Sequence, residues 1–99
     1  LAVLTLDSQL EHVLMQAMQS GSALEPGLAD TLVQQTASTL EQQEARGEPP
    51  VLVVQHALRP LLANFLRRRS PQLTVLSFAE IPDDYHIRVT YRIGGHARQ

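Results

Sequence analysis

A strand–helix–strand pattern between Pro49 and Pro82 constrains the fold of this 99-residue chain more than any other feature. Val51–Val54 is an uninterrupted aliphatic run after two prolines, and such a run is typical of a strand covered on both faces. Leu73–Phe78 is a second run of strand length. Between them, apolar residues recur at the spacing of one helix face: Leu58, Leu61, Leu62, Phe65 and Leu66. The pattern predicts a βαβ unit with parallel strands and a right-handed crossover.

The first half of the chain predicts one strand and two helices. Ala2–Leu6 is a short apolar run, and Ser8 with Glu11 forms a capping box just before a helical period. The residues of that period are expected to face the core: Leu10, Val13, Leu14, Ala17 and Met18. A second helix is expected to begin at Glu25-Pro26 and to end before Gly47. Its buried stripe consists of Leu28, Leu32, Val33, Ala37 and Leu40, and four glutamines fall largely outside it: Gln34, Gln35, Gln42 and Gln43.

The end of the chain predicts a last strand. Residues 86–93 alternate strictly, which places four apolar side chains on one face: Ile87, Val89, Tyr91 and Ile93. The connection Ala79–Asp84 is rich in turn formers. Because it is short for a parallel crossover, we expect the last strand to run antiparallel to Leu73–Phe78.

Together these elements predict an α/β fold. A small mixed sheet of about four strands is packed by three helices and contains one βαβ unit and a C-terminal antiparallel strand. We expect residues 1–94 to form a single domain and residues 95–99 to form a flexible tail. Since the chain opens on Leu1 rather than methionine, we interpret it as a piece of a longer protein.

Composition excludes several function classes. There is no cysteine, which rules out disulfides and thiolate metal sites, and no apolar run approaches membrane-spanning length. The basic residues are all arginine, and the formal charge of -2 gives no electrostatic reason for nucleic-acid binding. Glycine-rich phosphate loops and the G-x-S-x-G motif are absent from the sequence. We therefore expect no cofactor.

The histidines give no strong signal for a metal or catalytic site. His12, His56, His86 and His96 do not stand at i, i+4 spacing, so a preformed zinc site is not expected. His56 lies where a strand gives way to a helix, a common ligand position in open α/β sheets. A polar residue in an ordinary turn explains it better.

Two charged groups flank the strand Leu73–Phe78. The first is Arg67, Arg68 and Arg69, which suits an acidic partner or a phosphate but also matches the negative end of a helix dipole. The second is Glu80, Asp83 and Asp84. A carboxylate pair can serve in acid–base chemistry, yet no nucleophile accompanies it, and turn chemistry accounts for Asp83-Asp84.

Several ordered blocks of the sequence resemble the export gate proteins of bacterial type III secretion systems, which include flagellar and virulence members. The blocks that carry the resemblance are Leu4-Thr5-Leu6-Asp7, Leu24-Glu25-Pro26-Gly27-Leu28-Ala29, Pro50-Val51-Leu52-Val53-Val54, Leu58-Arg59-Pro60-Leu61-Leu62, Phe65-Leu66-Arg67-Arg68, Pro71-Gln72-Leu73-Thr74-Val75-Leu76-Ser77 and Glu80-Ile81-Pro82. They do not separate flagellar from virulence members, although the short tail after Ile93 favours virulence.

The resemblance implies a place and a role for the chain. It corresponds to the last subdomain of a cytoplasmic region that follows a membrane part and forms a nine-membered ring at the cytoplasmic face of the bacterial inner membrane. The implied role is non-enzymatic. Its implied partners are secretion substrates, their chaperones, the stalk protein of the export ATPase and neighbouring protomers. The expected contact residues are the two charged groups.

Two other functions stay open on the residues alone. One is a small α/β enzyme or phosphate-binding domain with His56 and Arg59 at the strand-to-helix turn, which lacks a nucleophile and a glycine-rich cradle. The other is an arginine-dependent nucleic-acid binder. That function needs exposed aromatic residues on a basic surface, and only 4% of the residues are aromatic.

Overall fold

The predicted βαβ unit is the centre of the structure. A computed structural model describes residues 2–21 and 24–94, and the expected tail at 95–99, with His96, lies outside them. The unit consists of β2 (Val51–Val54), a 3₁₀ turn (His56–Leu58), α3 (Arg59–Arg67) and β3 (Thr74–Ser77). β2 and β3 pair in parallel. This part of the sequence-based prediction is confirmed.

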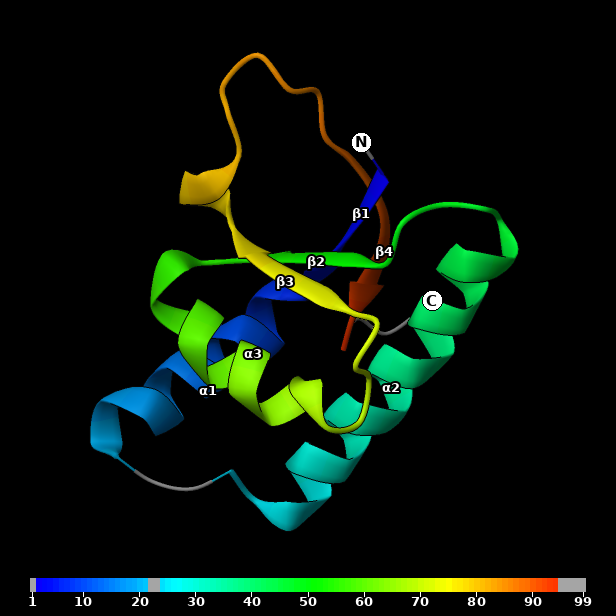
Figure 1. Cartoon of the computed structure of the whole chain (residues 1–99). Helices are drawn as coiled ribbons and strands as arrows, with labels where there is room; N and C mark the ends of the chain where they lie inside the picture. The colour runs from blue at the N-terminus through cyan, green and yellow to red at the C-terminus, as the bar shows by residue number, and fades with distance from the viewer. Residues whose placement is uncertain (1, 22–23, 95–99) are drawn as a thin grey trace.

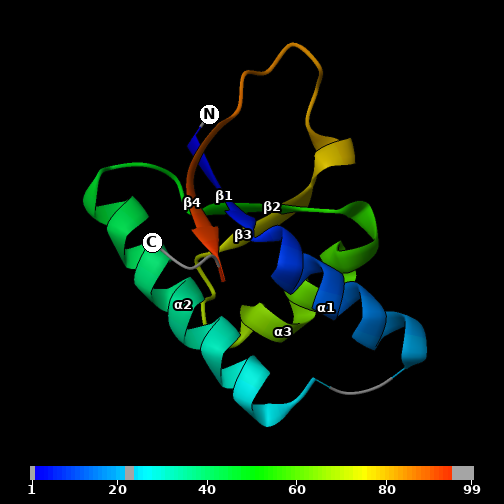
Figure 2. The ribbon, with the colours of Figure 1, turned by 180° about the vertical axis from the view of Figure 1, so that it is seen from behind.

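The remaining elements extend the same sheet. Before the unit come β1 (Ala2–Leu6), α1 (Ser8–Ser20) and α2 (Pro26–Ala45), and after it come a 3₁₀ turn (Phe78–Glu80) and β4 (Arg88–Ile93). The strand order is β3-β2-β1-β4. All three helices lie on one side of the sheet, and α2 runs the length of that layer (Figures 1 and 2).

The prediction that the C-terminal strand runs antiparallel is wrong. β4 pairs with β1, not with β3, and the two strands are parallel, with Ala2 opposite Arg88 and Leu6 opposite Ile93. The connection therefore crosses back over the whole sheet without a helix. The connection has to cross three strand spacings, about 15 Å, and return four residues, about 13 Å, along the strands, which together make a straight line of about 20 Å. Residues 78–87 can reach about 33 Å when extended. An extended segment is long enough, so the sheet is parallel rather than mixed.

The path of this connection follows from handedness. The steps from β1 to β2 and from β2 to β3 move in one direction across the sheet, so crossovers of the same hand place their helices on the same face. The step from β3 to β4 moves the opposite way, and a right-handed crossover then passes on the other side. The segment 78–87 indeed arches away from the helices, beyond the sheet (Figures 1 and 2).

A bulge in β4 changes which side chains face the core. Val3 is opposite Val89 but Leu4 is opposite Tyr91, so Thr90 is an extra residue in the ladder. Tyr91 consequently faces the helices with Leu4, while Val89 faces the side of the sheet away from the helices and is 44% exposed. The predicted grouping of Val89 with Tyr91 on one face is wrong, because strict alternation fails at the bulge.

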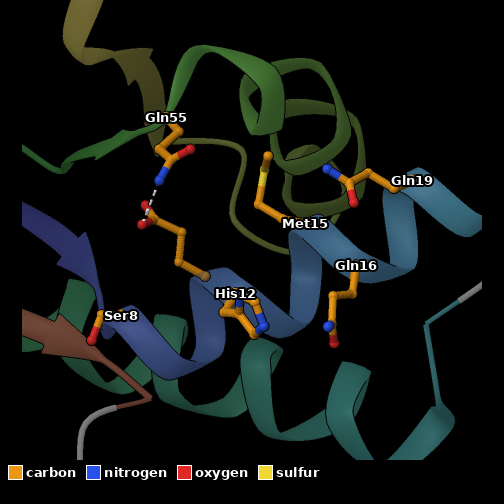
Figure 3. Close-up of a pocket in the computed structure, with 7 residues that line it drawn as sticks. Ser8, His12, Met15, Gln16, Gln19 and Gln55 are labelled. Atoms are coloured by element: carbon orange, nitrogen blue, oxygen red, sulfur yellow. Dashed lines mark hydrogen bonds between the residues drawn. The ribbon is translucent and has the colours of Figure 1, made fainter.

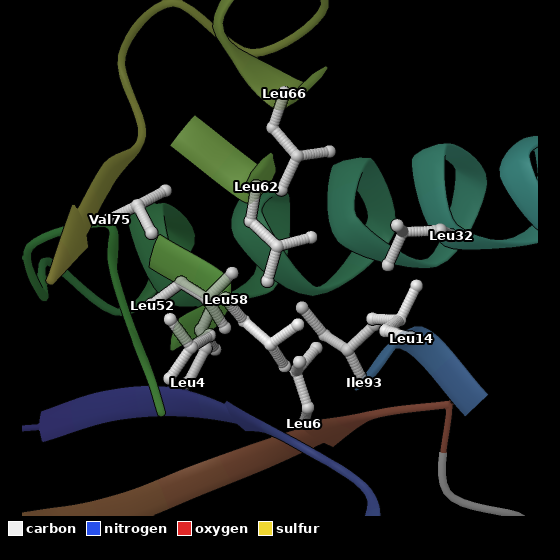
Figure 4. Close-up of a cluster of buried hydrophobic side chains, with 11 residues drawn as sticks. Leu4, Leu6, Leu14, Leu32, Leu52, Leu58, Leu62, Leu66, Val75 and Ile93 are labelled. Atoms are coloured by element: carbon white, nitrogen blue, oxygen red, sulfur yellow. The ribbon is translucent and has the colours of Figure 1, made fainter. Parts of the chain in front are cut away.

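The core lies between the sheet and the three helices (Figure 4). α3 contributes Leu62 and Leu66, with Leu58 from the preceding turn, and all three are essentially inaccessible to solvent. Phe65 is only partly buried at the edge of this cluster. The cluster consists of Leu4, Leu6, Leu14, Leu32, Leu52, Val54, Leu58, Leu62, Leu66, Val75 and Ile93.

α1 differs from its predicted form at both its start and its apolar stripe. Asp7, not Ser8, caps the helix, and its carboxylate accepts the Gln9 backbone N–H at 3.1 Å. Within the predicted stripe, Val13 is 43% and Met18 37% exposed. α1 therefore buries a narrower face than its periodicity indicates.

Truncating Leu62 to alanine should destabilise the chain more than truncating Phe65. Leu62 is fully buried and would leave a cavity, at a cost of about 2–5 kcal/mol out of a typical total of about 5–15 kcal/mol. Phe65 is partly exposed, so its neighbours and solvent can adjust. Urea unfolding midpoints measure the difference. Equal midpoints for the natural chain and Leu62→Ala would contradict the packing of α3.

Candidate functional site

The two charged groups lie at opposite ends of β3. Arg67 ends α3, and Arg68 and Arg69 precede β3, whereas the acidic group follows it in the 78–87 segment. The structure therefore does not bring the two groups together. A partner that contacts both has to span the edge of the sheet that β3 forms.

The arginine group lines an open hollow of about 390 Å³ together with Asn64 and Phe65. The Arg69 guanidinium carbon lies 4.9 Å from the centre of the Phe65 ring, a cation–π distance. Its Nη1 also donates to the Phe65 carbonyl at 3.3 Å. Arg67 and Arg68 are exposed and make no ion pair with the described residues. These two guanidinium groups are thus available to an anionic partner.

Glu80 is occupied by its own surroundings. Its Oε1 accepts the Ser77 backbone N–H at 2.8 Å and lies 2.5 Å from Arg59 Nε. The pKa of the Glu80 carboxyl lies below its ordinary value of 4.5, first because of the Ser77 hydrogen bond and also because of the Arg59 charge. Asp83 and Asp84 are exposed in the 78–87 segment. Only these two carboxylates of the acidic group face solvent without a described ion-pair partner.

Replacing Glu80 with glutamine should reduce the acid sensitivity of the fold. Because folding lowers the pKa of Glu80, the ionised carboxylate stabilises the chain above about pH 4.5 and loses this effect as pH falls through the folded-state pKa. Urea midpoints at about pH 6 and about pH 3 test this. The midpoint should fall less in Glu80→Gln than in the natural chain. An equal fall would show that the Ser77 and Arg59 contacts do not matter to folding.

The strand-to-helix turn, the alternative ligand position, offers few groups that could bind a ligand. His56 is exposed there, and the Arg59 charge is paired with Glu80. Next to it lies an open depression of about 350 Å³ between α1 and the end of β2. The Glu11 carboxylate accepts a hydrogen bond from the Gln55 amide at 2.8 Å. Figure 3 shows the His12 ring lying apart from Gln55. Within residues 2–21 and 24–94, no cluster of three His, Cys, Asp or Glu can hold a metal ion.

Gln43 is the important polar residue that the sequence analysis missed. It was expected largely outside the buried stripe of α2 but is completely buried. Its Nε2 donates to the carbonyls of Ala2 and Pro49, both at 3.2 Å, and its Oε1 accepts from Thr90 Oγ1 at 2.8 Å. The helical spacing of Leu32, Thr36, Leu40 and Gln43 is the signal that places it on the core face.

Gln43→Ala should lower the free energy of unfolding by about 1–3 kcal/mol, because the Ala2 and Pro49 carbonyls lose a hydrogen-bond donor and the part-buried Thr90 hydroxyl keeps only the Val3 carbonyl as acceptor. Gln42→Ala, one residue earlier and exposed, is the matched control and should change it by about 0.5 kcal/mol or less. Denaturant titration measures both. Similar losses in the two variants would mean that the buried amide adds nothing beyond helix propensity.

A second polar cluster fixes the start of β4 to the end of α2. Glu48 lies 2.6 Å from Arg88 Nη2 and 3.7 Å from Arg46 Nε. Arg46 Nη1 also donates to the Tyr91 hydroxyl at 3.5 Å. The pKa of Arg46 is raised, mainly by the Tyr91 hydrogen bond and then by the charge of Glu48. The charges of this cluster are therefore used to position β4. The charged groups beside β3 remain as the candidate contact surface.

The architecture is that of the C-terminal domains of type III export gate proteins. The C-terminal domain of InvA is 25% identical with a TM-score of 0.75, over 94% of this chain and 30% of that one. The Chlamydia pneumoniae CdsV protein has the same fold, with a TM-score of 0.78 at 23% identity, over 94% of this chain and 28% of its own.

The chain belongs to the FHIPEP family, which matches residues 1–86. It is 59% identical over 93 residues to the flagellar biosynthesis protein FlhA of Salmonella typhimurium and 56% identical to that of Proteus mirabilis. Each match covers 94% of this chain and only 13% of the relative's length. The resemblance to type III secretion export gate proteins is thereby confirmed. The chain is a component of the type III secretion export apparatus. None of its described helices is long and apolar enough to cross a membrane.

Proposed function

We propose that this chain is a protein-interaction subdomain of a type III secretion export gate. Residues 1–94 form one domain, the last of a larger cytoplasmic region that assembles into a nine-membered ring at the cytoplasmic face of the inner membrane. The subdomain is not an enzyme. Family membership and the similarity to C-terminal export gate domains support this proposal. The relatives that are 56–59% identical are flagellar proteins, which favours a flagellar system over the virulence system that the tail suggested.

The observation that carries the docking role is the pair of exposed charged groups flanking β3. Most of the apolar residues of α2 and α3 face the core, so these helices leave little apolar surface for a partner. Arg67 and Arg68 at one end, and Asp83 and Asp84 at the other, are accessible to a long charged partner. Arg69 supports the first group through its stacking on Phe65.

The partners that fit this surface are proteins with complementary charge. The stalk protein of the export ATPase is the first candidate, and secretion substrates with their chaperones follow. Neighbouring protomers complete the ring. Each exposed charge pair contributes about 1 kcal/mol or less and is screened by salt, so its main effect falls on the association rate.

Charge reversal at one end of β3 should slow docking of the stalk protein. The triple change Arg67→Glu, Arg68→Glu and Arg69→Glu tests the basic end, and Asp83→Arg with Asp84→Arg tests the acidic end. We expect one of these variants to lower the association rate by about tenfold at low salt and less at moderate salt. Glu41→Arg with Glu44→Arg, on the exposed side of α2, is the matched control.

Circular dichroism should show that all variants remain folded. If neither reversed group changes the association rate, or if the α2 control changes it equally, the docking surface lies elsewhere. Such a result would remove the charged groups from the proposed function and leave family membership unaffected.

A further inference from the structure

β3 forms one edge of the sheet, and among the described strands it pairs only with β2, in front of which it crosses in Figure 1. The Thr74 N–H donates to the Pro50 carbonyl at 2.9 Å and therefore points toward β2. In a parallel ladder, one residue bonds to the neighbouring strand through both its N–H and its carbonyl, and the next residue points both groups the other way. The N–H and the carbonyl of Val75 consequently face the open edge.

The outward N–H groups on either side of Val75 are already bonded within the chain. The Leu73 N–H donates to the Ser70 carbonyl at 3.0 Å. The Ser77 N–H donates to the Glu80 carboxylate at 2.8 Å. Between these two positions, the Leu73 carbonyl and both backbone groups of Val75 are available to a partner. The available part of the edge is therefore short and is centred on Val75.

A hollow of about 420 Å³ lies beside this edge, between β3 and α3. Its apolar lining comes from Ala63 and Leu66 on α3 and from Leu73 and Val75 on the other side. Arg67 also lines the hollow, and its guanidinium is exposed and makes no ion pair with the described residues. A segment lying along β3 thus meets backbone hydrogen-bonding groups, an apolar recess and a positive charge.

We propose that an extended segment of a partner protein binds along β3 as a fifth strand, with an apolar side chain in the hollow and an acidic side chain beside Arg67. Addition of a strand to an open sheet edge is a recurring mode of peptide recognition, in which main-chain bonds give affinity and alternate side chains give specificity. The acidic side chain complements the guanidinium of Arg67. The inference goes beyond the proposed function, because it depends on the edge and the hollow and not on a stalk protein or a ring.

A second copy of the chain fits this edge less well than a separate extended segment. In an antiparallel pair with Val75 opposite its counterpart, Leu73 of one copy faces Ser77 of the other. The N–H groups of both residues are already bonded, so only the two Val75 residues can exchange hydrogen bonds. An extended peptide brings its own unbonded N–H groups and can also donate to the Leu73 carbonyl.

Nuclear magnetic resonance on the 99-residue chain tests this binding mode. The probe is a peptide of about seven residues in which valine and threonine alternate, added up to about 1 mM. It is made in two forms, with a pair of aspartates at either end, because both strand directions are possible. Two control peptides carry N-methyl groups either on the valines or on the threonines. Only one of these two sets of N–H groups can face β3, so one control peptide should lose binding by at least about tenfold.

Hydrogen exchange of single amides locates the bound peptide. At saturation, the Val75 amide should exchange at least about tenfold more slowly than in the free chain, because it gains an acceptor. The Thr74 amide, which already bonds to Pro50, should change by less than about twofold.

Variants of the chain separate the backbone contact from the charge contact. Val75→Pro removes an N–H that faces the open edge, a position where proline is tolerated, and should lower the affinity at least about tenfold. Arg67→Gln should weaken binding of the aspartate peptide about threefold to fivefold and leave its asparagine analogue unchanged. Arg92→Gln is the matched control on β4, because Arg92 is also exposed and makes no ion pair with the described residues. If Val75→Pro does not fold, the N-methylated peptides make the same test on the natural chain.

Three results would overturn the proposal: no saturable binding of either aspartate peptide, binding that both N-methylated peptides retain, or binding without protection of the Val75 amide. Protection of that amide that rises with the concentration of the chain alone would also overturn it and assign the edge to a second copy. The peptide experiment uses no stalk protein, whereas the charge-reversal experiment depends on one. Failure of one proposal is therefore distinguishable from failure of the other.

Discussion

The position of β1 in the middle of the sheet is the constraint on which the remaining structure depends. β1 pairs with β2 on one edge and with β4 on the other, and all five of its residues are buried. The first strand of the chain thus cannot complete its hydrogen bonds until the last strand has returned. The Gln43 amide reinforces this arrangement, because it joins the first residue of β1 to the β4 bulge through Thr90.

Local pattern was sufficient for the elements but not for their pairing. The apolar run Val51–Val54 and the helical period that ends at Leu66 specified the βαβ unit, because both signals lie within one stretch of sequence. The partner of β4 is set by β1, at the other end of the chain, and no periodicity records that choice. The bulge at Thr90 could not be predicted for a related reason. The Thr90 hydroxyl bonds to Gln43, which lies on a helix distant in the sequence.

The sequence predicted which charged residues form the candidate site, but not which of them are structural and which are accessible to a partner. Arg67, Arg68, Asp83 and Asp84 stand out in the sequence by charge alone, and they are exposed. Glu80 belongs to the same acidic run, yet its carboxylate is engaged by Ser77 and by Arg59, a residue at the start of a different element. Charge density in a sequence therefore identifies a surface, while the division into structural and accessible charges needs the fold.

The parallel pairing of the first and last strands has a mechanical consequence. The chain enters the sheet at Ala2, at one end of β1, and leaves it at Ile93, at the opposite end of the adjacent β4. Tension applied along the polypeptide thus pulls these two strands past each other and loads their hydrogen bonds together in shear, rather than opening them one at a time. The resistance of the domain to stretching is therefore set by the β1–β4 pair and not by the packing of the helices.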